Sequence, residues 1–534
     1  MKVMLRIFSL FSMRYILLVA FSFMLGFTSH EKSNIKTPLG KPNIIFIMAD
    51  DLGRGLLSYY CQKIIKTPNI DKLAYEGVSF ENAYSSAYCA PARARFLTGY
   101  SDCRPGKYIL TSAGIYTKVA AGEMTDEEAQ KRINEVIGNE PDITYLPQVF
   151  KQAGYVTGQV GKLDYGFVTT TKQMNNHGWD YYYGYYDHQQ CHGFYPKFLY
   201  ENGTMIRISG NSRADAGKNG EWGDAESNDR RWNFAGKTVY SQDLFMQKTL
   251  EFIRTNKNKP FFLYHATQLP HGPVSVPSVH PDFAFDTSLT QIEKEYASMV
   301  KRLDDDVAIM MQELRKLGIA DNTIVIFSSD NGHEIYYSNK GRIEKPYRNM
   351  QTGQLFDDFT NVYSSALSGD VFDGNDGMAG LKRSNLEGGV RVPLFVYWPQ
   401  KFKKGLVDKS LVTNYDFLAT VADMLGVITK DKKDGISFLP VLRGEQNFKQ
   451  HEAIACATYE GPLLVTNDGW KLRYFASRKV YQLFYLPGDY REENDLAEKE
   501  PQKLKELKEI LKLKCDGDIQ NGVFTDAKNV RQIK

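Results

Sequence analysis

Five short apolar runs, each ending abruptly in polar residues, constrain the fold of this chain most. They are "NIIFIMADD" (43–51), "YVTGQVGKLD" (155–164), "PFFLYHATQLPH" (260–271), "NTIVIFSSDNG" (322–332) and "RVPLFVYWP" (391–399). Their apolar residues are continuous instead of alternating with polar ones. This pattern favours strands that are buried on both faces, as in a mostly parallel sheet.

Helical patterns lie between these runs. The clearest spans residues 296–318, where apolar side chains recur at helical spacing and Gly318 closes the segment. Strands that alternate with helices predict a doubly wound α/β sheet. In such sheets the ligand binds beyond the carboxyl ends of the strands, which is where the polar residues of these runs collect.

The pattern changes after about residue 445. "LLVTNDGWKLRYF" predicts a hairpin with Asn467, Asp468 and Gly469 at its turn, and a Lys/Glu-rich helix follows from Pro501 to about Leu513. We therefore expect a catalytic domain at 41–445 and a small α+β subdomain with an antiparallel sheet at 446–534.

The first 28 residues have the composition of a cleavable secretory signal. Lys2, Arg6 and Arg14 accompany the apolar run "YILLVAFSFMLGF", which is short for a bilayer span. We expect export to the periplasm or the medium without a membrane anchor. Loss of these three cations brings the formal charge of the chain from +3 to zero, which argues against nucleic acid as a partner. The irregular spacing of the six cysteines predicts no particular disulfide.

Two pairs of hard ligands stand at strand ends. Asp50 and Asp51 close the first run, and Asp330 and Asn331 close the fourth. Either pair alone is more often a helix cap or a turn. Together the four side chains supply the oxygen donors that Ca²⁺ prefers, whereas no histidine pair with zinc-ligand spacing is present.

The stretch "YCAPARARFLTG" (88–99) places a cysteine at a helix start. Pro91 suits a first helical turn, so Cys89 would lie at the N-terminus, with Arg93 on the same face. A thiol in that setting is acidic and reactive, although a buried structural cysteine is the alternative. Lys162, His271 and Lys382 also lie at predicted strand ends or in loops. Each alone is usually a solvated residue, but together with Arg93 they would form a pocket for a sulfate or phosphate ester.

These residues resemble the type I sulfatases of the alkaline phosphatase superfamily. The resemblance includes the signature C-x-P-x-R in "CAPARARFLTG", "PNIIFIMADDLG", "GK" at 161–162, "PHGP" at 270–273, "FSSDNG" at 327–332, "GLKRSNLEGGVRVPLFVYWP" at 380–399 and "DGISFLPVLRGE" at 434–445. It implies an alkaline-phosphatase-like α/β/α sandwich. It also implies that a maturation enzyme oxidises Cys89 to formylglycine (3-oxoalanine), whose hydrate carries one hydroxyl to attack sulfur and a second to expel sulfate.

The resemblance further implies the roles of the site residues. Asp50, Asp51, Asp330, Asn331 and the residue at 89 would hold Ca²⁺. Arg93 and Lys162 would steady the nucleophile and the sulfate oxygens, while His271 and Lys382 would flank the ester oxygen, with His271 as the general acid. His192, in the tyrosine-rich segment 179–196, and His333 would contact substrate.

The chain departs from the family pattern at two places. Asp164 stands in "GKLDYG" where the family commonly has the histidine that deprotonates the formylglycine hydrate, so Asp164 is the candidate base. A long insert separates Asn331 from Lys382, and it is either a substrate-shaping loop or a surface excursion.

We therefore predict an exported, Ca²⁺-dependent sulfatase that acts on a sulfated carbohydrate. One alternative is a phosphatase or phosphodiesterase of the same superfamily, although these usually carry two metals and a Ser or Thr nucleophile. The other is a degenerate sulfatase that binds an anion but has lost turnover because of Asp164.

Overall fold

The computed structural model describes residues 41–60, 62–213, 233–338, 346–399, 401–445 and 448–533. The predicted signal segment at 1–28 lies outside these ranges. None of the helices within them is long and apolar enough to cross a bilayer. The five cysteines that they include, at 89, 103, 191, 456 and 515, form no disulfide.

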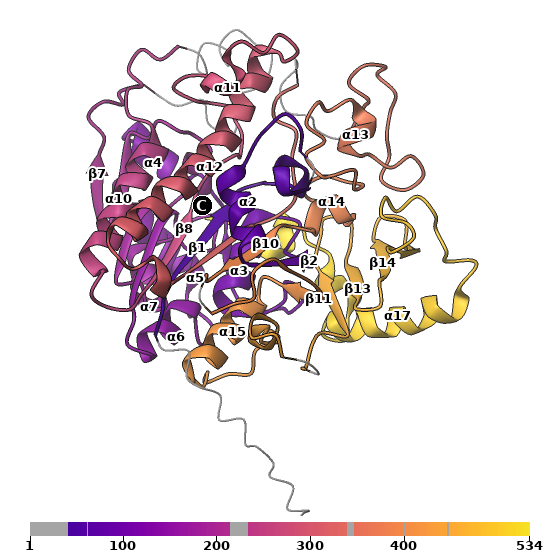
Figure 1. Cartoon of the computed structure of the whole chain (residues 1–534). Coiled ribbons are helices and arrows are strands. Elements are labelled where there is room, and N and C mark those ends of the chain that lie inside the picture. The colour runs from indigo at the N-terminus through magenta and orange to yellow at the C-terminus, as the bar shows by residue number, and fades with distance from the viewer. Residues whose placement is uncertain are drawn as a thin grey trace, which may run out of the picture. The chain divides into compact units, whose positions relative to one another are not determined.

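A mostly parallel sheet forms the centre of the described chain (Figure 1). Its ten strands lie in the order β11 (Leu406–Thr413), β2 (Val78–Tyr84), β10 (Leu394–Tyr397), β9 (Thr323–Ser329), β1 (Asn43–Ala49), β8 (Phe261–Ala266), β4 (Val156–Lys162), β5 (Tyr181–Tyr185), β6 (Phe198–Glu201) and β7 (Thr204–Arg207). All five predicted strands are present. Four of them, β9, β1, β8 and β4, are parallel neighbours, whereas β10 runs antiparallel to β9.

Helices cover both faces of this sheet, and β1 shows why its sequence is apolar throughout. Ile45 and Ile47 pack in one hydrophobic cluster with side chains of α10 (Ser241–Asn256) and α12 (Gln291–Lys316). Phe46 points the other way, and its ring lies 4.4 Å from Phe96 of α3 (Cys89–Thr98) and 4.9 Å from Phe417 of α15 (Asp416–Leu425). Successive side chains of a strand face opposite sides, so both sides of β1 require apolar residues.

The remaining helices in the described ranges are all shorter than α10 and α12. They are α2 (Pro68–Tyr75), α4 (Ile115–Ala121), α5 (Asp126–Ile137), α6 (Leu146–Gln152), α7 (Thr171–His177), α8 (His188–Cys191), α11 (Pro281–Ala284), α13 (Ser365–Ser368), α14 (Glu387–Val390), α16 (Leu439–Leu442), α17 (Pro501–Lys514) and α18 (Asp526–Asn529). The long helix α12 begins five residues before the predicted start at 296, because Thr290 and Glu293 form a capping box there.

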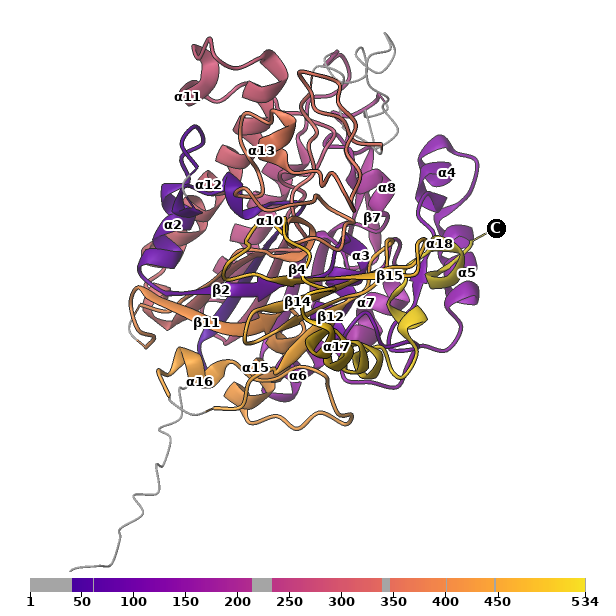
Figure 2. The ribbon, with the colours of Figure 1, turned by 90° about the vertical axis from the view of Figure 1, so that its right-hand side faces the viewer.

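The predicted C-terminal sheet is also present. Four antiparallel strands lie in the order β12 (Ala453–Cys456), β13 (Leu463–Thr466), β14 (Trp470–Phe475) and β15 (Val480–Tyr485), and β13 and β14 form the predicted hairpin. The helix α17 packs on this sheet through Leu507 and Leu511 (Figure 2). A short pair, β3 (Leu110–Thr111) and β16 (Val530–Arg531), joins the C-terminal residues to the segment after α3.

Much of the insert between Asn331 and Lys382 is packed into the molecule. Tyr363, Phe372 and Asn375 are buried. Its turn at Asp373 and Gly374 lies directly against Gly53 and Gly55, where an added Cβ would meet backbone oxygens at 2.0 and 1.9 Å. A surface excursion therefore does not describe this part of the insert.

Candidate active site

Neighbouring strand ends bring the predicted ligands together. Ala49 at the end of β1 pairs with Ser329 at the end of β9, so Asp50 and Asp330 follow side by side. Lys162 is the last residue of β4, two strands from β1. The side chains of Asp50, Asp51, Asp330, Asn331 and Lys162 are all buried. The parallel order of the sheet thus collects them at one edge.

Two cations, Lys162 and Arg93, lie beside the carboxylates of Asp50 and Asp330. Lys162 Nζ lies 2.8 Å from Asp50 Oδ2. Arg93 Nη2 lies 2.9 Å from Asp330 Oδ2 and 3.7 Å from Asp50 Oδ2. Burial lowers the pKa of both cations, but the neighbouring negative charges raise it above its ordinary value, so both stay charged.

Two buried oxygens in this group have no hydrogen-bond partner among the described residues. They are Oδ1 of Asp50 and Oδ1 of Asn331. Burial, followed by the charge of Asp50, raises the pKa of Asp330 to about 7. Buried polar atoms without a partner are costly, and a bound cation would satisfy both oxygens and offset the repulsion between the carboxylates. The site therefore fits a hard, oxygen-preferring ion.

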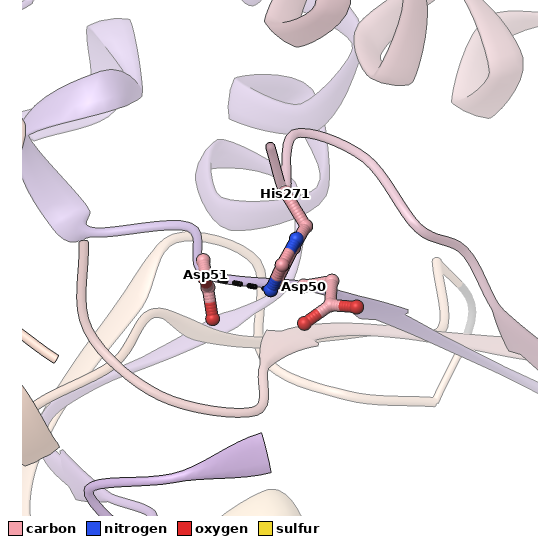
Figure 3. A group of neighbouring side chains, drawn as sticks. All are labelled: Asp50, Asp51 and His271. Carbon is pink, nitrogen blue, oxygen red and sulfur yellow. Dashed lines mark ion pairs between the residues drawn. The ribbon is translucent and has the colours of Figure 1, made fainter. Parts of the chain in front are cut away.

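The second aspartate, Asp51, lies beside Asp50 and contacts His271 (Figure 3). Lys382 Nζ lies 2.7 and 2.8 Å from the two carboxylate oxygens of Asp51, and His271 Nε2 lies 3.4 Å from its Oδ2. Burial raises the pKa of Asp51, but the charge and hydrogen bond of Lys382 outweigh it and hold the pKa well below its usual range. Atoms of Asp50, Asp51 and His271 lie within 4.8 Å of one another and could share one metal ion. This grouping overlaps the predicted ligand set but adds His271.

The orientation of His271 follows from its contacts. Its Nδ1 lies 2.5 Å from the carbonyl oxygen of Gly272, and a carbonyl can only accept a hydrogen bond. The Nδ1 atom of His271 therefore carries a proton, and Nε2 faces Asp51, Lys382 and Tyr336. The ring of His192 stacks on His271 at 4.0 Å. The structure thus brings His192 to the site.

Cys89 occupies the predicted position at the N-terminus of α3. It is the first residue of the helix, is buried, and follows Tyr88 in extended conformation. Cys89 lies within electrostatic range of Arg93, Lys162 and Lys382. A nucleophile formed at this position would face three positive charges as well as the helix N-terminus.

Asp164 and His333 have partners away from this group. Asp164 is buried, accepts a hydrogen bond from Thr169 at 3.1 Å and lies 2.9 Å from His177 Nδ1. The ring of His333 lies between the hydroxyls of Tyr296 and Tyr337, at 3.2 and 3.1 Å. The His333 ring also interacts with the backbone and the charge of Asp51. For Asp164, no contact found among the described residues reaches the Asp50 and Asp51 groups. The predicted roles of both residues stay predictions.

Tyr336 belongs to the site but has no signal in the sequence. Its hydroxyl donates to Asp51 Oδ2 at 2.5 Å and lies 3.3 Å from His271 Nε2. Tyr336 stands five residues after Asn331 in a segment without regular structure. Neither periodicity nor a motif points to it; only the packing of the insert brings its hydroxyl here.

Comparison with known proteins identifies the family. The profile described as "Sulfatase" matches residues 42–427, and that of "N-sulphoglucosamine sulphohydrolase, C-terminal" matches 381–517. An N-acetylgalactosamine-6-O-sulfatase of Bacteroides thetaiotaomicron is 28% identical over 532 residues, covering 88% of this chain and 92% of the relative. The human N-acetylgalactosamine-6-sulfatase is 29% identical, covering 75% of this chain and 66% of its own length.

Solved structures agree with these relatives. A 6S-sulfatase structure from work on glycosaminoglycan metabolism by Bacteroides thetaiotaomicron has a TM-score of 0.65 and 25% identity, covering 89% of this chain and 99% of its own. The predicted alkaline-phosphatase-like fold is thereby confirmed. With the family profile matching most of the chain, this protein belongs to the sulfatase family and is a sulfuric ester hydrolase.

Proposed function

We propose that this protein hydrolyses a sulfate monoester on a carbohydrate. The observation that carries this proposal is that three buried cations, Arg93, Lys162 and Lys382, interact electrostatically with Cys89 and pair with Asp50, Asp51 and Asp330. Two buried oxygens in the same group have no hydrogen-bond partner among the described residues. The carbohydrate class is supported by the relatives, which are named as N-acetylgalactosamine sulfatases. We also propose that the protein is exported, with residues 1–28 as the cleaved signal. The catalytic domain would end at residue 445, and the C-terminal subdomain would begin at residue 446.

The proposed site requires two groups that the chain alone does not supply. Asp50, Asp51, Asp330 and Asn331 would hold Ca²⁺ together with residue 89, and a maturation enzyme would convert Cys89 to formylglycine. When bound, Ca²⁺ would supply a positive charge that polarises the sulfate, and the formylglycine hydrate would supply the nucleophilic hydroxyl and the second hydroxyl needed for sulfate release. The oxygens of Asp50 and Asn331 described above are free to serve as ligands in this arrangement.

The chain's own residues bind and orient the ester. Arg93 and Lys162 lie 3.7 and 2.8 Å from Asp50 Oδ2 and can donate to sulfate oxygens. The Nε2 atom of His271 is the site for the proton that the departing alcohol requires, and Lys382 at 3.3 Å orients toward the same nitrogen. Deprotonation of the nucleophile is assigned to Asp164, and its pairing with His177 means that Asp164 must turn, or act through an intervening water.

The test is peptide mass spectrometry of host-matured protein across Cys89, combined with assays for sulfate release. We expect an aldehyde at residue 89 that reacts with a hydrazide, and inorganic sulfate released from sulfated saccharides. An unmodified thiol in active, host-matured protein would contradict the formylglycine assignment. Phosphate release from phosphate esters without sulfate release would favour the phosphatase alternative, and binding of sulfated sugars without turnover would favour the degenerate one.

A further inference from the structure

A hollow of about 540 Å³ lies between the insert and the C-terminal sheet. The insert supplies Tyr347, Phe356 and Phe359 to its lining. Phe475 of the C-terminal sheet and the loop residues Tyr459 and Arg478 beside it supply the other side. Figure 1 shows the α13 part of the insert on the same side of the molecule as β14. We call this hollow the aromatic pocket. Residues that are about a hundred positions apart in the sequence therefore form one binding-sized space.

The lining combines aromatic faces with hydrogen-bonding groups. Phe359 and Phe475 meet edge to face at 5.4 Å, and the guanidinium of Arg478 lies 4.7 Å above the ring of Phe359. Phe359 is half-buried, so part of its ring stays accessible. Aromatic rings with polar groups at their edges suit sugars, whose rings have an apolar face and a rim of hydroxyls.

The charge of the lining is acidic. Asp357, Asp358 and Glu460 contribute three carboxylates to the lining, against the one lining cation of Arg478, which lies 3.9 Å from Asp357. Outside the lining, Arg473 lies 3.9 Å from Glu460. Burial raises the pKa of Asp357, but hydrogen bonds from Thr360 and from the backbone of residues 359–361 hold it well below the usual range, so this carboxylate stays ionised. Like charges repel, so a sulfated or uronic acid residue is disfavoured here, whereas carboxylates readily accept hydrogen bonds from hydroxyls.

The pocket borders the catalytic segment. Glu460 Oε2 accepts a hydrogen bond from the backbone nitrogen of Asn385 at 3.1 Å, three residues after Lys382. On the same side, the ring of Tyr459 meets that of Tyr88 at 5.6 Å, and Tyr88 directly precedes Cys89. Lys382 Nζ lies 5.4 Å above that same Tyr88 ring. A sugar in the aromatic pocket would therefore lie next to the group that is being desulfated.

We propose that the aromatic pocket binds an uncharged sugar residue adjacent to the sulfated one, so that the substrate is an oligosaccharide with a neutral neighbouring sugar. This inference rests on the proposed function, because it assigns a second sugar-binding position to the same substrate. It predicts that the enzyme distinguishes its substrates by the charge of the neighbouring residue as well as by the sulfated sugar itself.

The test uses an array of sulfated oligosaccharides of defined sequence, probed with full-length Cys89→Ala protein, which has no nucleophile at residue 89 and so cannot turn substrate over. We expect the bound glycans to carry an uncharged sugar next to the sulfated one. Phe359→Ala should weaken their binding about tenfold, as expected for one lost aromatic contact. Phe285→Ala is the matched control, because Phe285 is 93% exposed and does not line the pocket.

Arg478→Ala, at an exposed position, provides a second test if Phe359→Ala does not fold. Glycans bound through anionic neighbours, binding unaffected by both pocket variants, or no glycan bound at all would each overturn the inference. Failure of the proposed function would give a different experimental result. The wild-type, host-matured protein would then release no sulfate from the glycans that the array shows to be bound.

Discussion

At the scale of single residues, the site is defined by how its charges are distributed over partners. Asp50 and Asp330 share Arg93 and Lys162, whereas Asp51 is held by Lys382, Asn331 and Tyr336. Two neighbouring aspartates therefore have different cation partners, although their ligand atoms remain within 4.8 Å of the same His271. Asp51 adopts a left-handed backbone conformation, with φ of 62°.

Tyr336→Phe should lower kcat/KM by about tenfold to a hundredfold without unfolding the protein. The substitution removes only the hydroxyl that contacts Asp51 and His271, and one hydrogen bond to a charged group is worth about 1.5–3 kcal/mol. Steady-state kinetics on a sulfated sugar measure the effect. Tyr181→Phe is the matched control, since that hydroxyl donates to Glu201 instead. Equal losses in both variants would contradict a specific role for Tyr336.

Ca²⁺ should raise the melting temperature of the protein, and a chelator should lower it. A ligand that binds only the folded state at about a hundred times its Kd stabilises by about 2.7 kcal/mol. Asp50→Asn should abolish most of this shift, because it removes the charge of a proposed Ca²⁺ ligand. Its Oδ1 is one of the two buried oxygens without a hydrogen-bond partner among the described residues. Differential scanning calorimetry with and without Ca²⁺ checks the result. Asp305→Asn, at a surface ion pair of α12, should keep the full shift.

The buried His177 predicts a pH dependence of stability. Burial lowers its pKa, but Asp164 and Glu140 raise it to about 9, above the ordinary 6.5. A raised pKa stabilises the folded protein fully below the unfolded value and loses this contribution as pH rises through 9. The contribution is about 3 kcal/mol at pH 6. Thermal unfolding from pH 6 to 10 should show it in the wild type and not in His177→Gln. Parallel pH curves for the two proteins would refute this role.

At the scale of elements, the insert and the loop after β1 depend on close backbone contact. Gly55→Ala should destabilise the protein by about 1–3 kcal/mol, the usual cost of overpacking. An added Cβ would meet the backbone oxygen of Asp373 at 1.9 Å, and this atom cannot move as a flexible side chain would. Thermal unfolding measures the effect. Gly488→Ala is the control, because its nearest atoms lie 4.0 Å away. Equal melting temperatures would show that the insert adjusts freely.

At the scale of the whole molecule, the C-terminal sheet holds the segment that carries Lys382. Lys471 of β14 is completely buried and lies 3.0 Å from Glu387 and 2.9 Å from Glu492. Arg473 of the same strand donates to Asn385 at 2.7 Å. The sheet is therefore connected to the active site through buried charges as well as apolar packing.

Lys471→Met should destabilise the protein by about 3–5 kcal/mol and lower kcat, because it removes a buried cation from Glu492 and leaves Glu387 with Arg391, at 3.4 Å, as its cation. Glu387 lies five residues after Lys382, so its displacement should move the catalytic lysine. Kinetics below the melting temperature, together with thermal unfolding, measure both effects. Lys505→Met on the exposed side of α17 should change neither. A loss of stability without any change in kcat would limit Lys471 to a purely structural role.

The sequence by itself determined the strands, the hairpin, the helix at Cys89 and the residue types that meet at the sheet edge. These follow from local periodicity and from the parallel order of strands, which places their carboxyl ends together. Only the tertiary structure decided the partners. Asp51 meets Lys382 across 331 positions and Tyr336 across 285, and Asp164 turns to His177. Such pairings depend on how distant segments pack, and local sequence patterns carry no record of that packing.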